Sequence, residues 1–226
     1  MRNLRLATLT LACALLAVGG CTSGDKKKDR AESESWACAK LMGKEGMAWL
    51  KNPTPPSEPD PDDPGTVAYA RSEFRKQVPT WKPKEFDFPH TARSEMCDIG
   101  NPKRDPGDDF VLTYGAAAYP FDKHPGPNSE EISVRVGPDA KLVYGKDHQR
   151  DEWMYYVYVK CGAPGAPASQ LNDVTLEGWM SDRLTGDPSH RTHLRYLLHS
   201  AKVMADAFDC TNNPQIPTTV PSSVKD

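Results

Sequence analysis

An apolar stretch near the N-terminus sets the conditions under which the rest of this chain must fold. Met1 to Arg5 carries two positive charges and no acidic residue, and Leu6 to Gly20 carries no charge at all. A cationic start, a short apolar segment and small residues at its end are the three parts of a secretory signal. The stretch is shorter than the roughly 18 apolar residues of a permanent membrane helix. The sequence therefore predicts a signal peptide over 1–20 and folding in an oxidising, extracytoplasmic compartment.

The residues that follow this stretch resemble the lipobox of bacterial lipoproteins. In Val18-Gly19-Gly20-Cys21, a branched residue stands three places before the cysteine and small residues fill the gap. The resemblance implies cleavage before Cys21 and a thioether-linked lipid on its sulfur. One acyl chain binds a bilayer only marginally, whereas two or more anchor a protein stably. The resemblance predicts a protein that is anchored at Cys21 to the outer face of the cell membrane. The alternative is an ordinary secretory signal with a chance cysteine beside it.

The number of cysteines favours the lipidated form. Cleavage before Cys21 and its lipidation leave an even set of four thiols, whereas a chain without the lipid would have five. An unpaired thiol is disfavoured in an oxidising compartment. Four cysteines allow three pairings, and the sequence leaves all three open. Pairing in chain order would link each terminal helix to the sheet, and the four residues are Cys38, Cys97, Cys161 and Cys210.

Charge and composition indicate one ordinary domain with polar extensions. Cleavage would remove two of the 28 basic residues and none of the 31 acidic ones, which gives a net charge near −5. The sequence therefore offers no basic patch for nucleic acid. We expect a flexible tether over 21–35, a single domain over 36–211, an acidic proline-rich loop over 52–65 and a disordered tail over 212–226. Lys26-Lys27-Lys28 in the tether either rests on anionic headgroups or stays solvated.

Apolar residues at helical spacing predict a long helix near the C-terminus. Asp187 is the expected N-cap, Pro188 the first helical residue and Cys210 the end of the helix. The apolar stripe consists of Leu194, Leu197, Leu198, Ala201, Met204, Ala205 and Phe208.

Two weaker helices are predicted earlier in the chain. The segment 67–78 begins after a capping Thr66 and must end before Pro79. The segment 36–51 should be short or broken, because Gly43 and Gly46 each cost about 1 kcal/mol relative to alanine.

Strand patterns fill the middle of the chain. Alternating or continuous apolar runs cover 109–119, 131–136, 141–145, 153–160 and 173–179, and Gly137-Pro138-Asp139-Ala140 is typical of a tight turn. Short connections without helices indicate antiparallel pairing. We therefore predict an α+β fold, in which a meander of about five strands packs against N- and C-terminal helices linked to it by disulfides.

No motif for catalysis or metal binding stands out. His190 and His193 share a helix face, but no further zinc ligand lies at a workable spacing, so a solvated helix start is expected. The acidic loop matches three positions of a calcium-binding EF-hand but has Arg71 where a glutamate is required. Signatures of serine nucleophiles, phosphate loops and dinucleotide sites are missing. The sequence therefore predicts no catalytic residue, no metal and no cofactor.

The segment 153–159 is apolar or aromatic on both faces of the predicted strand. Trp153 and Tyr155 lie on one face, and Tyr156 and Tyr158 on the other. One interpretation is a central strand that is covered on both sides. The other is an aromatic groove formed by these four residues, which would bind an envelope glycan, a peptide or protein, or an acyl chain.

The layout as a whole resembles uncharacterised lipoproteins of high-GC Gram-positive (actinobacterial) cell envelopes. The resemblance rests on the junction Val18 to Cys21, the polar tether, the four cysteines and the helical ending Leu197-Leu198-His199…Phe208-Asp209-Cys210. It implies no particular activity. Two hypotheses follow: a non-enzymatic binding module of the cell envelope, or an envelope hydrolase with a carboxylate- or histidine-based site. The absence of a catalytic signature favours the first.

Overall fold

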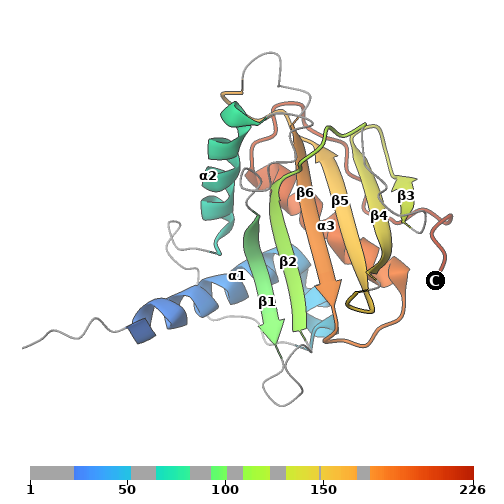
Figure 1. Ribbon diagram of the computed structural model, residues 1–226, viewed down its shortest axis with the longest axis horizontal. Coiled ribbons are helices and arrows are strands. Elements are labelled where there is room, and N and C mark those ends of the chain that lie inside the picture. The colour runs from blue at the N-terminus through green and yellow to red at the C-terminus, as the bar shows by residue number, and fades with distance from the viewer. Residues whose placement is uncertain are drawn as a thin grey trace, which may run out of the picture.

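A computed structural model describes the backbone of residues 23–51, 65–81, 93–100, 109–122, 131–147, 149–166 and 174–226, and the side chains from Trp36 onward. The predicted signal peptide, Cys21 and most of the acidic loop lie outside these residues. The described chain forms an α+β fold, as predicted, with helices packed on one face of an antiparallel sheet (Figure 1).

The sheet has six strands in the order β1-β2-β6-β5-β4-β3, and every neighbouring pair is antiparallel. The last four strands follow one another as the predicted meander. The first two form a hairpin that joins this meander through β2 and β6, so that β2 and β3 are not neighbours. The strands are β1 (Ser94–Gly100), β2 (Asp109–Ala116), β3 (Ile132–Arg135), β4 (Ala140–Asp147), β5 (Glu152–Lys160) and β6 (Thr175–Asp182).

Strand β1 was not predicted from the sequence, and a bulge explains why. The pairing register of β1 with β2 shifts between Glu95 and Cys97, and the consecutive residues Met96 and Cys97 are both buried. A bulge interrupts the alternation of inward and outward side chains on which strand prediction depends. The sheet therefore has one strand more than expected.

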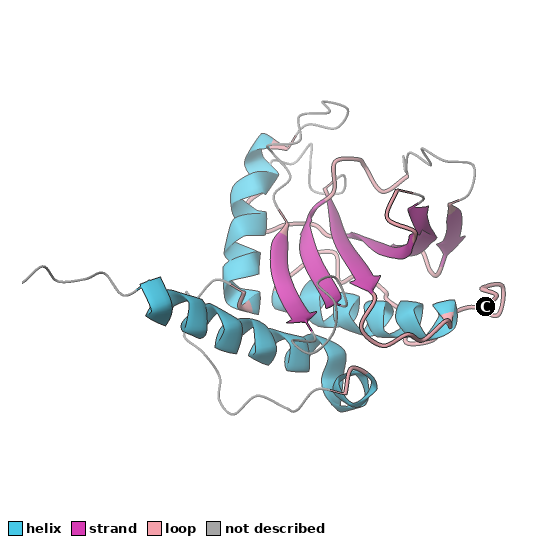
Figure 2. Ribbon diagram, turned by 60° about the horizontal axis from the view of Figure 1, so that its bottom comes forward, coloured by secondary structure: helices cyan, strands magenta, loops and turns pink. Residues whose placement is uncertain are grey.

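The helices lie along a single face of the sheet, as Figure 2 shows for α1 and α3. Their bounds are α1 (Ser23–Trp49), α2 (Val67–Gln77) and α3 (His190–Ala207), and a short 3₁₀ helix, η1 (Val78–Thr80), follows α2. The helices and this face of the sheet share one hydrophobic core, which includes Leu41, Phe74, Leu112 and Leu197. We call the opposite face of the sheet the open face.

Helix α1 is broken where the sequence predicts a break. Gly43 has φ 65° and ψ 179°, far from helical values, so the chain bends there and then resumes its helix. Glycine tolerates this positive φ, whereas a residue with a Cβ atom would be strained. The helix begins at Ser23, inside the segment 21–35 that the sequence assigns to a flexible tether.

The caps of α2 and α3 agree with the sequence in one case only. The Thr66 side chain accepts a hydrogen bond from Tyr69 N, as predicted for a cap. Helix α3, in contrast, is capped by Ser189 and not by Asp187, because Ser189 Oγ accepts from Thr192 N at 3.2 Å. Asp187 accepts from Ser189 N instead, so the predicted start of this helix was two residues too early.

Two disulfides join the helices to the sheet in the order favoured from the sequence. Cys38 of α1 bonds to Cys97 of β1, and Cys161, just after β5, bonds to Cys210, just after α3. Each bridge closes a loop of about fifty to sixty residues, with sequence separations of 59 and 49. The bridges therefore fix both terminal helices onto the sheet.

The C-terminal segment packs against α3 rather than forming the disordered tail predicted over 212–226. Arg191 donates hydrogen bonds to the carbonyl oxygens of Pro221, Val224 and Val220, and the Val224 side chain is buried. Composition suggested a loose segment, because threonine, serine and proline offer little apolar surface. Arg191 holds the segment against α3 instead, because it binds three of the segment's backbone carbonyl oxygens.

Candidate functional site

The four aromatic residues proposed as a binding surface lie on opposite faces of β5. Trp153 and Tyr155 point to the face covered by α3, where Tyr155 is 3% and Trp153 37% exposed. Tyr156 and Tyr158 point to the open face and stack on each other with ring centroids 6.2 Å apart. Because the two pairs point to opposite sides of the sheet, the four residues do not form a common groove.

On the helix-covered face, Tyr155 contacts both histidines of α3. Its hydroxyl lies 3.0 Å from His190 Nδ1, and its ring stacks on His193 with centroids 4.5 Å apart. Burial raises the pKa of Tyr155, so its hydroxyl stays protonated and donates to His190. Burial also lowers the pKa of His190, which favours the neutral ring that can accept this bond.

His193 is buried, in contrast to the solvated helix start expected from the sequence. Its Nε2 lies 2.8 Å from Asp182 Oδ2, and its Nδ1 lies 2.7 Å from the Ser189 carbonyl oxygen. Trp49 packs edge-on against the ring. With His193 and Asp182 only 2% and 1% exposed, a substrate in solution does not reach this pair.

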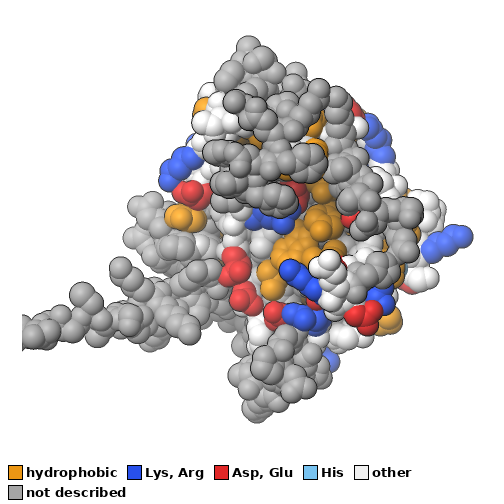
Figure 3. Space-filling model, in the orientation of Figure 1, with side chains coloured by type: hydrophobic (Ala, Val, Ile, Leu, Met, Phe, Trp, Pro, Cys, Tyr) orange, Lys and Arg blue, Asp and Glu red, His pale blue; other side chains and the backbone are white. Residues whose placement is uncertain are grey.

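The tyrosines of the open face belong to a small second core. Tyr158 packs with Ala117, Phe121 and Val143, and Figure 3 shows hydrophobic side chains between lysine and arginine side chains on this side of the molecule. Lys141 Nζ lies 5.1 Å from the Phe121 ring centroid and donates to the Phe121 carbonyl oxygen. The aromatic rings are thus already covered by cations of the chain itself. Burial lowers the pKa of Lys141 to about 8.

Buried carboxylates of the open face are also occupied. Glu177 forms an ion pair with Arg93, and burial raises the pKa of this carboxyl group. Glu152 accepts from Ser181 Oγ and pairs with Arg183. Among the residues that the structure describes, no group of three or more acidic, histidine or cysteine side chains could hold a metal ion.

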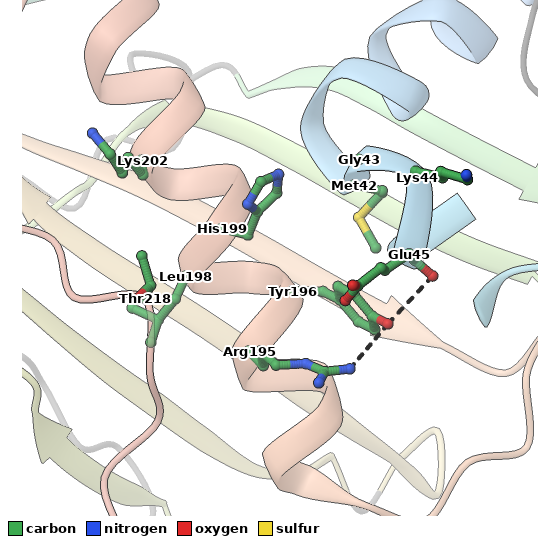
Figure 4. A pocket seen from close by; sticks show the side chains of 10 residues that line it. All are labelled: Met42, Gly43, Lys44, Glu45, Arg195, Tyr196, Leu198, His199, Lys202 and Thr218. Atoms are coloured by element: carbon green, nitrogen blue, oxygen red, sulfur yellow. Dashed lines mark hydrogen bonds between the residues drawn. The ribbon is translucent and has the colours of Figure 1, made fainter. Parts of the chain in front are cut away.

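A cavity between the bend of α1 and the outer side of α3 remains open, and we call it the α1–α3 cleft. It has a volume of about 290 Å³ and offers more apolar than polar surface. Met42, Leu198 and Tyr196 form its apolar part (Figure 4). The full lining consists of Met42, Gly43, Lys44, Glu45, Arg195, Tyr196, Leu198, His199, Lys202 and Thr218. Side chains of two helices and of the C-terminal segment therefore converge on one hollow.

The bend at Gly43 keeps the two helices close enough to form this cleft. A Cβ atom at Gly43 would lie 3.2 Å from His199 Nε2, so α1 passes almost against the His199 ring. Three residues earlier in α3, Tyr196 donates its hydroxyl proton to the Glu45 carbonyl oxygen at 3.3 Å. Its ring stacks on Trp49, with centroids 4.9 Å apart. These contacts hold the floor of the cleft in place without filling it.

Positive charge surrounds the cleft in a chain that is acidic overall. Arg195 donates to Tyr196 Oη at 3.0 Å and lies over the Tyr196 ring, and Lys202 pairs with Asp206 one turn further along α3. In the described part of the chain, neither Arg195 nor Lys44 forms an ion pair with a carboxylate. The sequence analysis missed these residues, although Arg191, Arg195, His199 and Lys202 follow one another at the spacing of a single helix face.

A second cavity adjoins the cleft, and we call it the tail cavity. It has a volume of about 260 Å³ and shares Arg195 and Thr218 with the α1–α3 cleft. The rest of its lining comes from α3 and the C-terminal segment: Arg191, Thr192, Thr219 and Val220. Two arginines and three threonines line this cavity, so polar groups make up a larger share of its surface than of the surface of the cleft.

Comparisons of the chain with known protein families, with curated proteins and with solved structures find no match. Within the described residues, no helix combines the length and apolar character that crossing a membrane requires. The functional interpretation therefore rests on the geometry of the two cavities and on the sequence.

Proposed function

We propose that this chain is a lipid-anchored, extracytoplasmic binding module of the cell envelope, which takes a small ligand into the α1–α3 cleft. The observation that carries the proposal is the cleft itself, an open hollow of about 290 Å³ with an apolar floor. Binding sites for small molecules are concave and mostly apolar, with a few polar groups, and begin at about 300 Å³. The cleft therefore suits a ligand of modest size.

The proposed location draws support from two independent features. The N-terminal 20 residues have the layout of an export signal, and Val18-Gly19-Gly20-Cys21 resembles a lipobox. The two disulfides are typical of proteins that fold in an oxidising compartment.

A role in binding agrees better with the described side chains than a hydrolase does. The His193–Asp182 pair has the composition of an acid–base dyad but is buried and fully hydrogen bonded. The two buried acidic side chains of the open face, Glu177 and Glu152, are held by Arg93 and Arg183. A general acid or base must come within hydrogen-bonding distance of a substrate, and these groups are engaged with the protein.

The methyl group of Met42 provides a local test of binding. The full chain, labelled with ¹³C at its methionine methyl groups and held in phosphatidylcholine nanodiscs, is titrated with 1-hexanol as an apolar probe. We expect a saturable shift of the Met42 signal, which a Met42→Leu variant identifies, and no shift for Met154 on the open face. Absence of a shift at Met42 would overturn the proposed function.

A matched pair of tryptophan variants tests whether the cleft is the site. Thr218→Trp should block the mouth of the cleft and abolish the Met42 shift. Ser222→Trp, also on the exposed part of the C-terminal segment but outside both cavities, should leave it unchanged. A Thr218→Trp variant that responds to 1-hexanol like the unaltered chain would place binding elsewhere.

The anchor has its own test, intact-mass spectrometry of the protein purified from membranes. We expect a mass that corresponds to cleavage before Cys21 plus acyl chains, and a gain of four hydrogens on reduction of the two disulfides. Cys21→Ser should release the protein from the membrane fraction. A full-length mass without lipid contradicts the proposed anchor but leaves the binding test intact.

A further inference from the structure

We propose that the tail cavity is a phosphate subsite, so that the ligand of the α1–α3 cleft is a phosphate ester of a small apolar group. This inference rests on the proposed function and specifies its ligand class. The two cavities share Arg195 and Thr218, so one ligand can occupy both, with its apolar part against Met42 and Leu198. Its charged end would then lie among Arg191, Arg195 and the threonine hydroxyls.

In the part of the chain that the structure describes, the guanidinium groups of the two arginines that line the tail cavity have no carboxylate partner, which favours an anionic ligand. Exposed arginines elsewhere have acidic partners, as Arg71 and Arg75 share Asp209 at 3.3 and 2.9 Å. Arg195 forms no such pair within the described residues. Only one of its guanidinium nitrogens donates a hydrogen bond there, to the hydroxyl oxygen of Tyr196. The Arg191 guanidinium group donates to neutral carbonyl oxygens of the C-terminal segment, and the nearby Asp226 accepts from the Arg191 backbone N–H and not from its guanidinium group.

Acidic groups near the two cavities are fewer than the basic ones and are engaged elsewhere. Asp226 accepts from Arg191 N and Ser189 Oγ at the start of α3, and Asp206 pairs with Lys202. Glu45 is the one acidic residue in the lining of either cavity, against Lys44, Arg191, Arg195 and Lys202. The lining therefore keeps an excess of positive charge for an anion to neutralise.

The donors of the tail cavity favour phosphate among the anions. A guanidinium group presents parallel N–H donors that match two oxygens of a phosphate or a carboxylate. Thr192, Thr218 and Thr219 add three hydroxyl donors around the same hollow. A carboxylate has two oxygens in one plane, whereas a phosphate ester presents up to three terminal oxygens in a tetrahedral array. The remaining donors of Arg195 together with three threonines suit the second arrangement, and Arg191, whose guanidinium group binds carbonyl oxygens, adds its positive charge.

The same chemistry has two sources in a cell envelope, a free phosphate ester and the phosphate of a lipid headgroup. Both would place a phosphate in the tail cavity and an apolar group in the cleft. A comparison of nanodiscs made of phosphatidylcholine alone with nanodiscs that contain phosphatidic acid distinguishes them. If the headgroup is the source, phosphatidic acid shifts the Met42 signal without added ligand. If a free ester is the source, only the added ester does so.

The decisive experiment compares hexyl phosphate with 1-hexanol on the same Met42 methyl signal in phosphatidylcholine nanodiscs. Hydrogen bonds between charged groups are stronger than those between neutral groups, so hexyl phosphate should bind roughly 10-fold tighter than 1-hexanol or more. Inorganic phosphate should compete with hexyl phosphate but not with 1-hexanol. Arg195 lines both cavities, so the comparison is between the two probes: Arg195→Gln should weaken hexyl phosphate about 10-fold more than it weakens 1-hexanol, and Arg195→Lys should fall between Arg195→Gln and the unaltered chain.

The outcomes separate this inference from the proposed function. Equal affinity for hexyl phosphate and 1-hexanol, with no effect of Arg195→Gln, overturns the phosphate subsite and leaves the apolar cleft standing. Absence of 1-hexanol binding at Met42 overturns the proposed function. An unchanged Met154 signal in Arg195→Gln verifies that the variant is folded. A loss of hexyl phosphate affinity in this folded variant that exceeds its loss of 1-hexanol affinity about 10-fold supports the subsite.

Discussion

His193 donates its Nε2 proton to Asp182 across 2.8 Å, at a point where neither side chain is more than 2% exposed. Its Nδ1 faces the carbonyl oxygen of Ser189, which can only accept a hydrogen bond. Asp182 in turn accepts from the backbone N–H groups of Leu184 and Thr185, as an ionised carboxylate does. Both ring nitrogens of His193 are therefore donors, and a buried imidazolium–carboxylate pair ties the end of β6 to the first turn of α3.

Removal of the negative charge from this pair should destabilise the fold strongly. Asp182→Asn leaves the His193 cation buried without its counter-charge, and loss of one partner of a buried pair costs about 3–5 kcal/mol. Urea unfolding followed by circular dichroism measures the difference. The control is Asp109→Asn, which breaks an exposed pair with Arg183 and should cost about 1 kcal/mol or less. Equal stability of the two variants would contradict a buried ion pair.

Acid should destabilise the protein through Asp182 in particular. Burial alone would raise the pKa of this carboxyl group, but hydrogen bonds from His193 and Thr185, together with the charge of His193, lower it below its usual value. Such a group contributes stability above its unfolded pKa of about 3.9, and the contribution is lost as the pH falls through the lower folded pKa. The free energy of unfolding, measured from about pH 6 to about pH 2, should fall more steeply in the unaltered chain than in Asp182→Asn. Parallel curves would show that the pKa of Asp182 is not lowered on folding.

A methyl group at Gly178 should not fit. A Cβ atom there would lie 2.5 Å from the Tyr114 ring and 2.8 Å from Val157, and Tyr114 is held by a 2.6 Å hydrogen bond to Ser200 of α3. Gly178→Ala should lower the free energy of unfolding by about 1–3 kcal/mol or more, as overpacking of a core does. Gly100→Ala, also in a strand but with nothing within 4 Å of the new atom, is the control and should be near neutral. A neutral Gly178→Ala variant would mean that Tyr114 can move away from β6.

The two disulfides should contribute similar stability because they close loops of similar length. The chain-entropy relation gives about 4 kcal/mol for each, from the sequence separations of 59 and 49. The double variants Cys38→Ala/Cys97→Ala and Cys161→Ala/Cys210→Ala should each lose roughly this amount in urea unfolding. A loss below about 1 kcal/mol for either variant would show that its loop is already restricted in the unfolded chain.

The parts of the fold that were predicted correctly are those with a clear local pattern in the sequence. All seven residues of the apolar stripe from Leu194 to Phe208 are buried, and the Gly137–Ala140 turn joins β3 to β4 as expected. The class of fold was likewise predicted, and the disulfides have the pairing that was favoured among the three left open by the sequence. The placement of β6 between β2 and β5 was not, because strand order depends on pairing between distant segments and leaves no local pattern in the sequence.

The candidate site was less accessible to sequence reasoning than the fold. The cleft exists because the bend at Gly43 brings α1 beside His199 and because Arg191 holds the C-terminal segment over α3. Neither contact follows from local spacing, and the prolines and threonines of that segment indicated disorder. The one sequence pattern that indicates this side of the helix is the row of basic residues on one face of α3, from Arg191 to Lys202.

If the chain is exported, as proposed, the order of its disulfides has a consequence for its biogenesis. Each bridge joins a cysteine to the next one along the sequence, Cys38 to Cys97 and Cys161 to Cys210. In a chain that leaves a translocation channel with its N-terminus first, Cys97 emerges while Cys161 is still inside, so the first bridge can close before Cys161 or Cys210 is present. An oxidase that simply couples thiols as they appear would then produce the native connectivity, without an isomerase to rearrange it.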